Sequence, residues 1–335
     1  MANPGWSHAE SPFHAGELAI QARLGVQTQM DKQARRVVRD YLPQQHQQFY
    51  SQLPYLLVGT VDASGRPWAS MLVGEPGFVS SPNDSASATK VVRTLHIASK
   101  PLVGDPLSMT LAEGVDIGLL GIELHTRRRN RMNGTVIAVD TDGFTVQVGQ
   151  SFGNCPQYIQ ARMFELNSVN PTTPQPIYQV KSLGEPERAI IAAADTFFIA
   201  TAFQEKDAGA AKGVDVSHRG GKPGFVRMND AHTLTIPDFV GNFHFNTFGN
   251  LLLNPHAGLL FVDFDRGNLM YLTGTAEVIW DGDEIQSFEG AERLLRFHLS
   301  AGYRVEGSLP LRWSAPDFSP FLVGVASLTE NRTGS

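Results

Sequence analysis

The chain has 335 residues, 42% of them hydrophobic and 18% charged, with a formal net charge of -6. This composition is typical of a water-soluble globular protein, and the negative charge argues against broad nucleic-acid binding. No apolar run reaches the roughly 18 residues of a membrane-spanning helix, and no secretory signal is visible at the N-terminus. Cys155 is the only cysteine, which excludes an intrachain disulfide and favours a cytoplasmic location.

Helical spacing of apolar residues predicts a helical lead-in over residues 1–50, with a helix near 31–41 that Pro43 ends. Beyond it the pattern changes to strands. These are expected at 56–61, 68–73, 92–97, 116–123, 131–139 and 143–148, with a turn at 62–65 and an exposed loop at 80–89. A helix is expected from Cys155 to about Phe164, because Pro156 suits a first helical turn.

The Pro- and Thr-rich residues 170–176 predict a domain boundary. The second half is expected to contain helices at 185–194, 246–253 and 287–300, and strands at 196–202, 214–217, 224–228, 233–236, 258–264 and 269–280. Each half then has about six strands and one or two helices, the content of a small antiparallel barrel. The expected domains are residues 1–50, 51–170 and 171–335, the last with a C-terminal helix.

The two halves repeat each other. Gly-Leu-Leu occurs at Gly118 and again at Gly258, 140 residues later, and Gly134 and Gly274 keep the same offset. The tetrapeptide Pro-Gly-Phe-Val occurs at 76–79 and at 223–226. Markers in the same order indicate a duplicated domain. The seam between two such copies is a natural ligand site.

Several motifs are specific enough to indicate a family. Residues 213–221 read GVDVSHRGG, residues 223–227 PGFVR, residues 246–250 NTFGN and residues 151–160 SFGNCPQYIQ. This pattern resembles the FMN-binding split barrel of the pyridoxamine 5'-phosphate oxidase-like proteins, over roughly residues 15 to 325. The last motif resembles a subgroup often fused upstream of a ferredoxin-reductase-type module. The resemblance implies a mainly β (α+β) fold of two tandem antiparallel split β-barrels with short flanking helices, arranged as a pseudo-dimer that holds FMN.

The sequence departs from the family in two places. Residues 242–247 contain no Lys or Arg, whereas the true pyridoxamine phosphate oxidases carry them near the flavin phosphate, so vitamin B6 activity is not expected. The chain also lacks the cysteine-rich loop of an iron–sulfur domain. A reductase partner would therefore lie on another polypeptide or have been removed.

Candidate cofactor-binding residues follow from the needs of FMN. A phosphate takes cations, hydroxyls and helix N-termini, which points in the second half to Ser217, His218, Arg219, Asn242, His244, Asn246 and Thr247. The alternative is that His218 and Arg219 lie in a solvated hairpin and that Asn246 only caps a helix. The first copy has Trp68-Ala69-Ser70-Met71 in the corresponding hairpin, which predicts one flavin per chain.

The first half is expected to contribute Arg129 or Arg131, Asn154 and Gln157 across the seam. The alternative is that the arginine run 127–131 is a solvated face. Cys155 is expected to be a small buried residue rather than a redox group. Arg293, Arg296 and Arg304 are expected at the surface, and no histidine spacing indicates a metal site.

The leading hypothesis is an FMN-dependent oxidoreductase that acts on a small-molecule substrate or electron donor, with no catalytic side chain assigned. The alternative is a non-catalytic protein that binds, stores or senses flavin, haem or a deazaflavin. A third is an inert structural pseudo-dimer. Neither nucleic acid nor a membrane is expected as a partner, and the chain could pair with a second copy as a homodimer.

Overall fold

The computed structural model of the chain describes residues 5–81, 91–166, 175–205 and 209–322. Its N-terminal part contains three helices, α1 (Ala15–Arg23), α2 (Gln27–Val37) and α3 (Gln44–Ser51). The helix expected at 31–41 therefore begins and ends earlier in the chain. Pro43, expected to stop that helix, is the N-cap of α3 instead, a position at which its fixed φ and missing N–H are tolerated.

The first sheet has seven strands in the order β2-β1-β5-β6-β7-β4-β3, all antiparallel. The strands are β1 (Tyr55–Val61), β2 (Pro67–Val73), β3 (Val79–Ser80), β4 (Thr94–Ile97), β5 (Asp116–Glu123), β6 (Arg128–Val139) and β7 (Phe144–Gly153). A short helix, α4 (Leu107–Thr110), lies between β4 and β5 along the chain. The strand predictions for this half are confirmed, with shifts at their ends.

The second sheet has eight strands, seven of them in the order β11-β10-β14-β15-β16-β13-β12, and β9 pairs with β16. The strands are β9 (Ile177–Val180), β10 (Thr196–Phe203), β11 (Gly213–Gly220), β12 (Arg227–Met228), β13 (Thr233–Asp238), β14 (His256–Val262), β15 (Leu269–Ile279) and β16 (Arg293–Val305). Helix α5 (Glu185–Ala193) precedes β10, and α6 (Asn246–Leu253) precedes β14. A small ribbon pairs β8 (Phe164–Leu166) with β17 (Leu311–Trp313).

The two sheets have the same strand order when their strands are matched along the chain. The repeated glycines occupy equivalent irregularities. The strand register shifts between Asn133 and Gly134 in β6, and between Thr273 and Gly274 in β15. At Gly274 a Cβ atom would lie 1.9 Å from the carbonyl oxygen of His298, so the close approach of the backbone requires glycine. The fold class, mainly β with two tandem antiparallel barrel-like sheets, is confirmed.

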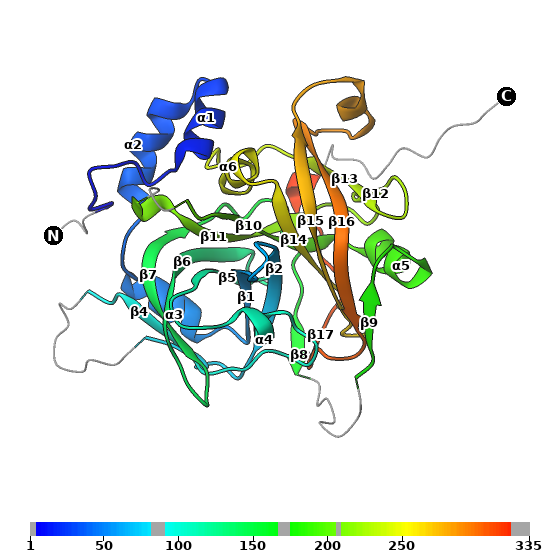
Figure 1. Cartoon of the computed structure of the whole chain (residues 1–335), viewed down its shortest axis with the longest axis horizontal. Helices are drawn as coiled ribbons and strands as arrows, with labels where there is room; N and C mark the ends of the chain where they lie inside the picture. Colours follow the sequence, from blue (N-terminus) through cyan, green and yellow to red (C-terminus); the bar gives the residue numbers. More distant parts are fainter. Residues whose placement is uncertain (1–4, 82–90, 167–174, 206–208, 323–335) are drawn as a thin grey trace.

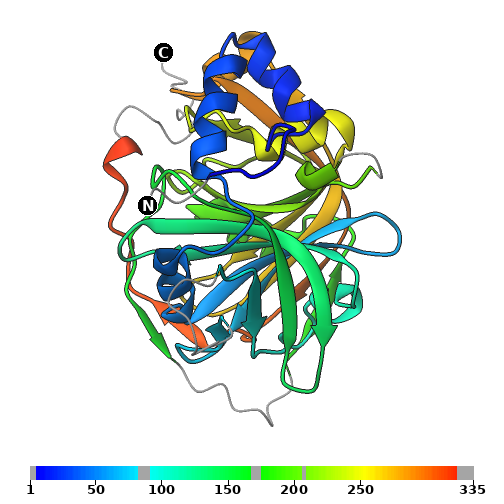
Figure 2. The same cartoon turned by 90° about the vertical axis from the view of Figure 1, so that its left-hand side faces the viewer.

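The two sheets pack against each other along a seam formed by β1, β2 and β5 of the first and β10, β11 and β14 of the second (Figures 1 and 2). Each sheet encloses a core of its own. A third cluster joins them, with Trp68 and Leu120 from the first sheet and Phe198 and Tyr271 from the second, all 1% exposed or less. Burial of large apolar side chains at the seam holds the halves together.

Helix α1 packs on α6, and both lie at the same end of the seam (Figure 1). The two backbones approach closely, because a Cβ atom on Gly16 would lie 2.1 Å from the carbonyl oxygen of Gly249. Two buried polar side chains of α1 reach this region. Glu17 accepts a hydrogen bond from the side chain of Asn246, and Gln21 donates to the carbonyl oxygens of Phe243 and His244.

Two predicted helices are wrong. The C-terminal helix expected at 287–300 is largely β16, in which Leu295, Phe297 and Leu299 face the core and Arg296 and His298 face outward, the period of two that defines a strand. The helix expected at 155–164 is irregular chain. Tyr158 there has φ 61°, and the carbonyl oxygens of Cys155 and Ile159 accept hydrogen bonds from arginine side chains instead of helical N–H groups.

Part of the expected loop at 80–89 and most of the connector at 170–176 lie outside the described residues. No helix in the described part of the chain is long and apolar enough to cross a membrane.

Candidate functional site

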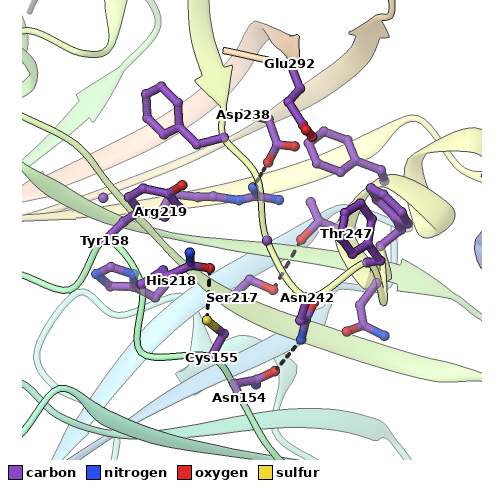
Figure 3. Close-up of a pocket in the computed structure, with 18 of the residues that line it drawn as sticks. Asn154, Cys155, Tyr158, Ser217, His218, Arg219, Asp238, Asn242, Thr247 and Glu292 are labelled. Carbon is purple, nitrogen blue, oxygen red and sulfur yellow. Dashed lines mark hydrogen bonds and ion pairs between the residues drawn. The ribbon is translucent and has the colours of Figure 1, made fainter. Parts of the chain in front are cut away.

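A cleft of about 130 Å³ lies where the two halves meet near α6 (Figure 3). The first half lines it with residues of β6 and of the segment after β7. The second half contributes β11, the end of β13, the segment that leads into α6, and the start of β16. The cleft therefore has walls from both copies of the repeat, which is where the sequence predicts a ligand site.

One end of the cleft holds a network of paired charges. Asp238 accepts hydrogen bonds from Arg219 and, at 2.9 Å, from Arg293, which also pairs with Glu292. The two guanidinium groups lie over aromatic rings, Arg219 at 4.8 Å from Phe248 and Arg293 at 5.1 Å from Phe245. Burial raises the pKa of Asp238, although both arginines act to lower it. Each cation here has a carboxylate partner, so this end is close to charge balance.

Arg131, which lines the cleft, forms a second ion pair. Arg131 contacts Asp215 at 3.1 Å and donates to the hydroxyl of Ser217. Asp215 also accepts hydrogen bonds of 2.7 Å from Asn133 and from Asn250. Arg131 is 4% exposed, and its Nε has no hydrogen-bond partner among the described residues. A buried N–H without an acceptor is costly, and a bound ligand would satisfy it.

Arg129 differs from these arginines in its partners. Its Nε donates to the carbonyl oxygen of Cys155 at 2.7 Å, and its Nη1 donates to the carbonyl oxygen of His218 at 3.5 Å. Within the described residues, no carboxylate forms an ion pair with it. Burial, together with the charge of Arg131, lowers its pKa to about 10, which leaves it charged at neutral pH. Arg129 therefore supplies a positive charge that no carboxylate of the described residues neutralises.

His218 faces the cleft from β11 and is 5% exposed. Burial lowers its pKa well below the usual value, and the charges of Arg129 and Arg219 lower it further, so the imidazole is neutral at physiological pH. Its Nε2 is buried without a partner in the described part of the chain. The alternative of a solvated hairpin is therefore wrong for His218 and for Arg219, which is paired with Asp238.

The segment that leads into α6 is held in an unusual conformation. Phe243 and Phe245 have φ angles of 58° and 61°, values that bulky residues rarely adopt and that concentrate at functional sites. Gln21 of α1 holds this segment, because its side-chain amide donates to the carbonyl oxygens of Phe243 and His244. The N–H groups of the first turn of α6 then point, as in any helix, to a region without intrahelical acceptors.

Nine of the ten residues proposed from the sequence line this cleft: Arg129, Asn154, Gln157, Ser217, His218, Arg219, Asn242, Asn246 and Thr247. Their binding of a cofactor stays a prediction. His244 does not line it. Its ring packs 5.3 Å from Phe13 and 5.6 Å from Phe152, and burial lowers its pKa to about 4. His244 is part of the packing between the N-terminal segment and the first half.

Other residues that line the cleft were not predicted from the sequence. Arg293, expected at the surface, is 4% exposed and lines the cleft, and Arg304 is 7% exposed. The position of Arg293 was not predicted, because residues 287–300 were wrongly expected to form a helix. Asp238 and Tyr158 also line the cleft, and neither was proposed as a cofactor-binding residue, although Tyr158 lies in the motif at 151–160. Cys155 is half-buried in the cleft wall, with Sγ 3.0 Å from Oε1 of Gln157, rather than in a core.

The internal repeat relates the cleft to a second region between the two sheets, around Gly104 and Asp105, which we call the second seam. This second seam is closed. Gly104 packs against Val305, so that even a Cβ atom on Gly104 would lie 2.8 Å from it. The carboxylate of Asp105 accepts hydrogen bonds from Ser70 at 2.5 Å, from the N–H of Leu107 at 2.8 Å and from Tyr271 at 3.2 Å.

The stability of the protein should depend on pH through Asp105. Burial raises its pKa from 3.8 to about 6, although its hydrogen bonds act to lower it. The protonated carboxyl thus favours the folded state, and its contribution of about 3 kcal/mol is full below the unfolded pKa and lost as pH rises through the folded one. We expect the free energy of unfolding of wild type, relative to Asp105→Asn, to fall between pH 4 and pH 7. Urea denaturation measures it, and a difference that stays constant with pH would contradict this.

The sequence matches no family model and no curated protein. Solved structures that align with it include HupZ from Group A Streptococcus, with 16% identity, 35% of this chain and 88% of that chain covered, and a TM-score of 0.28. A putative pyridoxamine 5'-phosphate oxidase from Lactobacillus delbrueckii shows 15% identity, covers 36% of this chain and 93% of its own, and has a TM-score of 0.28. A FAD-binding protein from Mesorhizobium loti shows 10% identity, 38% and 97% coverage, and a TM-score of 0.25.

Proposed function

We propose that the cleft binds FMN without a covalent bond and that the protein is an FMN-dependent oxidoreductase. The observation that carries this proposal is Arg129, a charged group in the cleft wall that no described carboxylate neutralises. A site with excess positive charge, hydroxyl groups and a helix N-terminus is suited to an anionic phosphate. The sequence motifs around Ser217 and Asn246 support a flavin as the molecule that carries it.

The cleft residues fit the chemistry of FMN. Ser217 and Thr247 offer hydroxyl groups and Asn246 an amide, beside Arg129 and Arg131. The buried Nε2 of His218 and Nε of Arg131 have no partners among the described residues, and a polar ligand would supply them. The volume of about 130 Å³ is below the roughly 300 Å³ of pockets that enclose a ligand. FMN would thus lie partly in the open mouth of the cleft.

The protein residues would bind and orient the cofactor. The charge of Arg129 attracts its negative charge, the buried Nε of Arg131 can donate a hydrogen bond, and the neutral imidazole of His218 can exchange a hydrogen bond at Nε2 without adding charge. The rings of Phe243, Phe245 and Phe248 give the wall an apolar surface that excludes water from one side. When bound, a flavin supplies hydride or electron transfer, and the protein needs to supply only position and access.

The proposed substrate is a small molecule or a redox partner that reaches the open mouth. The charge pairs Arg219–Asp238 and Arg293–Glu292 already neutralise one another. We therefore expect these paired side chains to form a fixed polar wall of the cleft and not to donate protons. No side chain is assigned as a general acid or base. Electrons would come from a reduced nicotinamide or from a separate reductase.

The purified protein should be yellow and release one FMN per chain on denaturation. One is expected because Asp105 fills the second seam. Absorption spectroscopy with chromatography of the released cofactor measures both, and anaerobic addition of NADH or NADPH tests reduction. A colourless protein that fails to bind added FMN would contradict the proposal. A haem band would favour the alternative of a binding or sensing protein, and two flavins per chain would contradict the asymmetry.

A further inference from the structure

The internal repeat allows the residues of the closed seam to be matched with those of the cleft. Gly59 and Ala200 are matched positions of the repeat, because their strand partners in β5 and β14 belong to the two copies of Gly-Leu-Leu. Ser70 in β2 and Ser217 in β11 each lie one residue after the other strand partner of these positions, so the two serines are equivalent. It also aligns Tyr271 in β15 with Arg131 in β6, since their partners Leu260 and Leu120 belong to the repeated Gly-Leu-Leu.

The short helix α4 and helix α6 match in the same way. The buried hydroxyl of Thr110 in α4 lies 2.7 Å from Thr60 in β1, and Asn250 in α6 donates at 3.0 Å to Thr201, the equivalent residue of β10. Thr110 and Asn250 have the same 140-residue offset as the repeated glycines. Leu107 is therefore the counterpart of Thr247, and Asp105 that of Phe245.

Three groups in the closed seam converge on one carboxylate. The hydroxyl of Ser70, the N–H of Leu107 and the hydroxyl of Tyr271 all donate to Asp105, which is 1% exposed. Their counterparts are the hydroxyl of Ser217, the N–H of Thr247 and the guanidinium of Arg131. These counterparts line the cleft.

We propose that Asp105 is an internal anion that fills, in the closed seam, the place where the cleft takes the anionic group of its ligand. The anion site of the cleft then lies between the Ser217 hydroxyl, the first turn of α6 and Arg131. That this anion is the phosphate of FMN rests on the proposed function. The anion site itself does not.

The differences between the seams agree with this assignment. Phe245, at the position that matches Asp105, has a left-handed backbone and a ring beside the guanidinium of Arg293, so the second half supplies no carboxylate of its own from that position. Arg131 replaces Tyr271 and brings more N–H donors; its charge is paired with Asp215, while its Nε lacks a partner in the described residues. A phosphate has more acceptor oxygens than a carboxylate, and the additional N–H donors of Arg131 suit it.

Removing the internal anion should create a site for a small carboxylate. We expect Asp105→Ala to be less stable than wild type at pH 8 and to regain roughly 2–4 °C of Tm in sodium formate, relative to sodium chloride at equal ionic strength. Wild type and Asp105→Asn, which keeps an acceptor oxygen, should show no such gain. If formate raises the Tm of all three proteins equally, Asp105 is not an internal anion.

The cleft is tested separately with Ser217→Ala. We expect this variant to lose roughly tenfold or more in affinity for FMN while its affinity for riboflavin, which lacks the phosphate, stays unchanged. Equal losses for both flavins would overturn the placement of the anion. If wild type binds neither flavin, the proposed function fails. Inorganic phosphate then serves as the probe: a rise in Tm with phosphate that Ser217→Ala abolishes supports the site, and a rise that persists refutes it.

Discussion

Replacing Arg129 with glutamine is expected to weaken FMN binding by roughly 10- to 100-fold. Arg129 is the cleft arginine without a described carboxylate partner, so its charge is available to the ligand. A hydrogen bond to a charged group contributes about 1.5–3 kcal/mol, and each 1.4 kcal/mol is tenfold in affinity. Titration of FMN fluorescence against the variant measures the dissociation constant.

Arg128→Gln is the matched control. Arg128 is the preceding residue of β6 and its side chain lies on the opposite face, 5.2 Å from the ring of Phe49, because successive residues of a strand alternate. Both variants change the net charge equally, so a purely long-range effect would weaken FMN binding alike in each. If Arg128→Gln matches Arg129→Gln, or if neither changes the affinity, Arg129 does not contact the ligand.

Replacing Arg131 with methionine should destabilise the protein by about 3–5 kcal/mol, because it leaves the buried carboxylate of Asp215 without its cation. Asp215 is 6% exposed, and its remaining hydrogen-bond donors within the described residues, Asn133 and Asn250, are neutral. Urea denaturation followed by tryptophan fluorescence measures the loss. This effect requires no ligand and is expected in the protein freed of any cofactor.

The double variant Arg131→Met with Asp215→Asn separates a lost charge pair from a lost side chain. Removing both charges should recover a large part of the stability, since the main cost of the single change is the unpaired charge. A double variant no more stable than Arg131→Met would show that packing of the long arginine side chain dominates. A single variant within 1 kcal/mol of wild type would contradict the buried pair.

Most strands of both halves could be predicted because they combine apolar runs with turn residues at regular spacing. The glycine repeat also carried structural information, since Gly134 and Gly274 mark the same register shift in both sheets. Residues 293–300 were predicted to be helical because Leu294, Leu295, Phe297 and Leu299 fit either period. The pairing of β16 with β13, β15 and β9 shows that this segment is a strand. Contacts between strands that are distant in the sequence cannot be inferred from a short stretch of residues.

The candidate site was predictable where chemistry and motif coincide, as at Ser217, His218 and Arg219. Asp238 and Arg293 could not be found in this way, because they meet across 55 residues of sequence. His244 was misassigned for a local reason. The left-handed backbone of its two neighbours directs its ring away from the cleft, and no propensity predicts left-handed phenylalanines.

Both walls of the cleft belong to one polypeptide, and this determines how the site responds to dilution. Where two separate subunits form a site, mass action empties it as the protein concentration falls below their dissociation constant. Here a covalent connection keeps the second wall at a high effective concentration. Ligand affinity should therefore be the same at nanomolar and micromolar protein. Because the two seams need not stay identical, one can be closed by its own carboxylate while the other remains open.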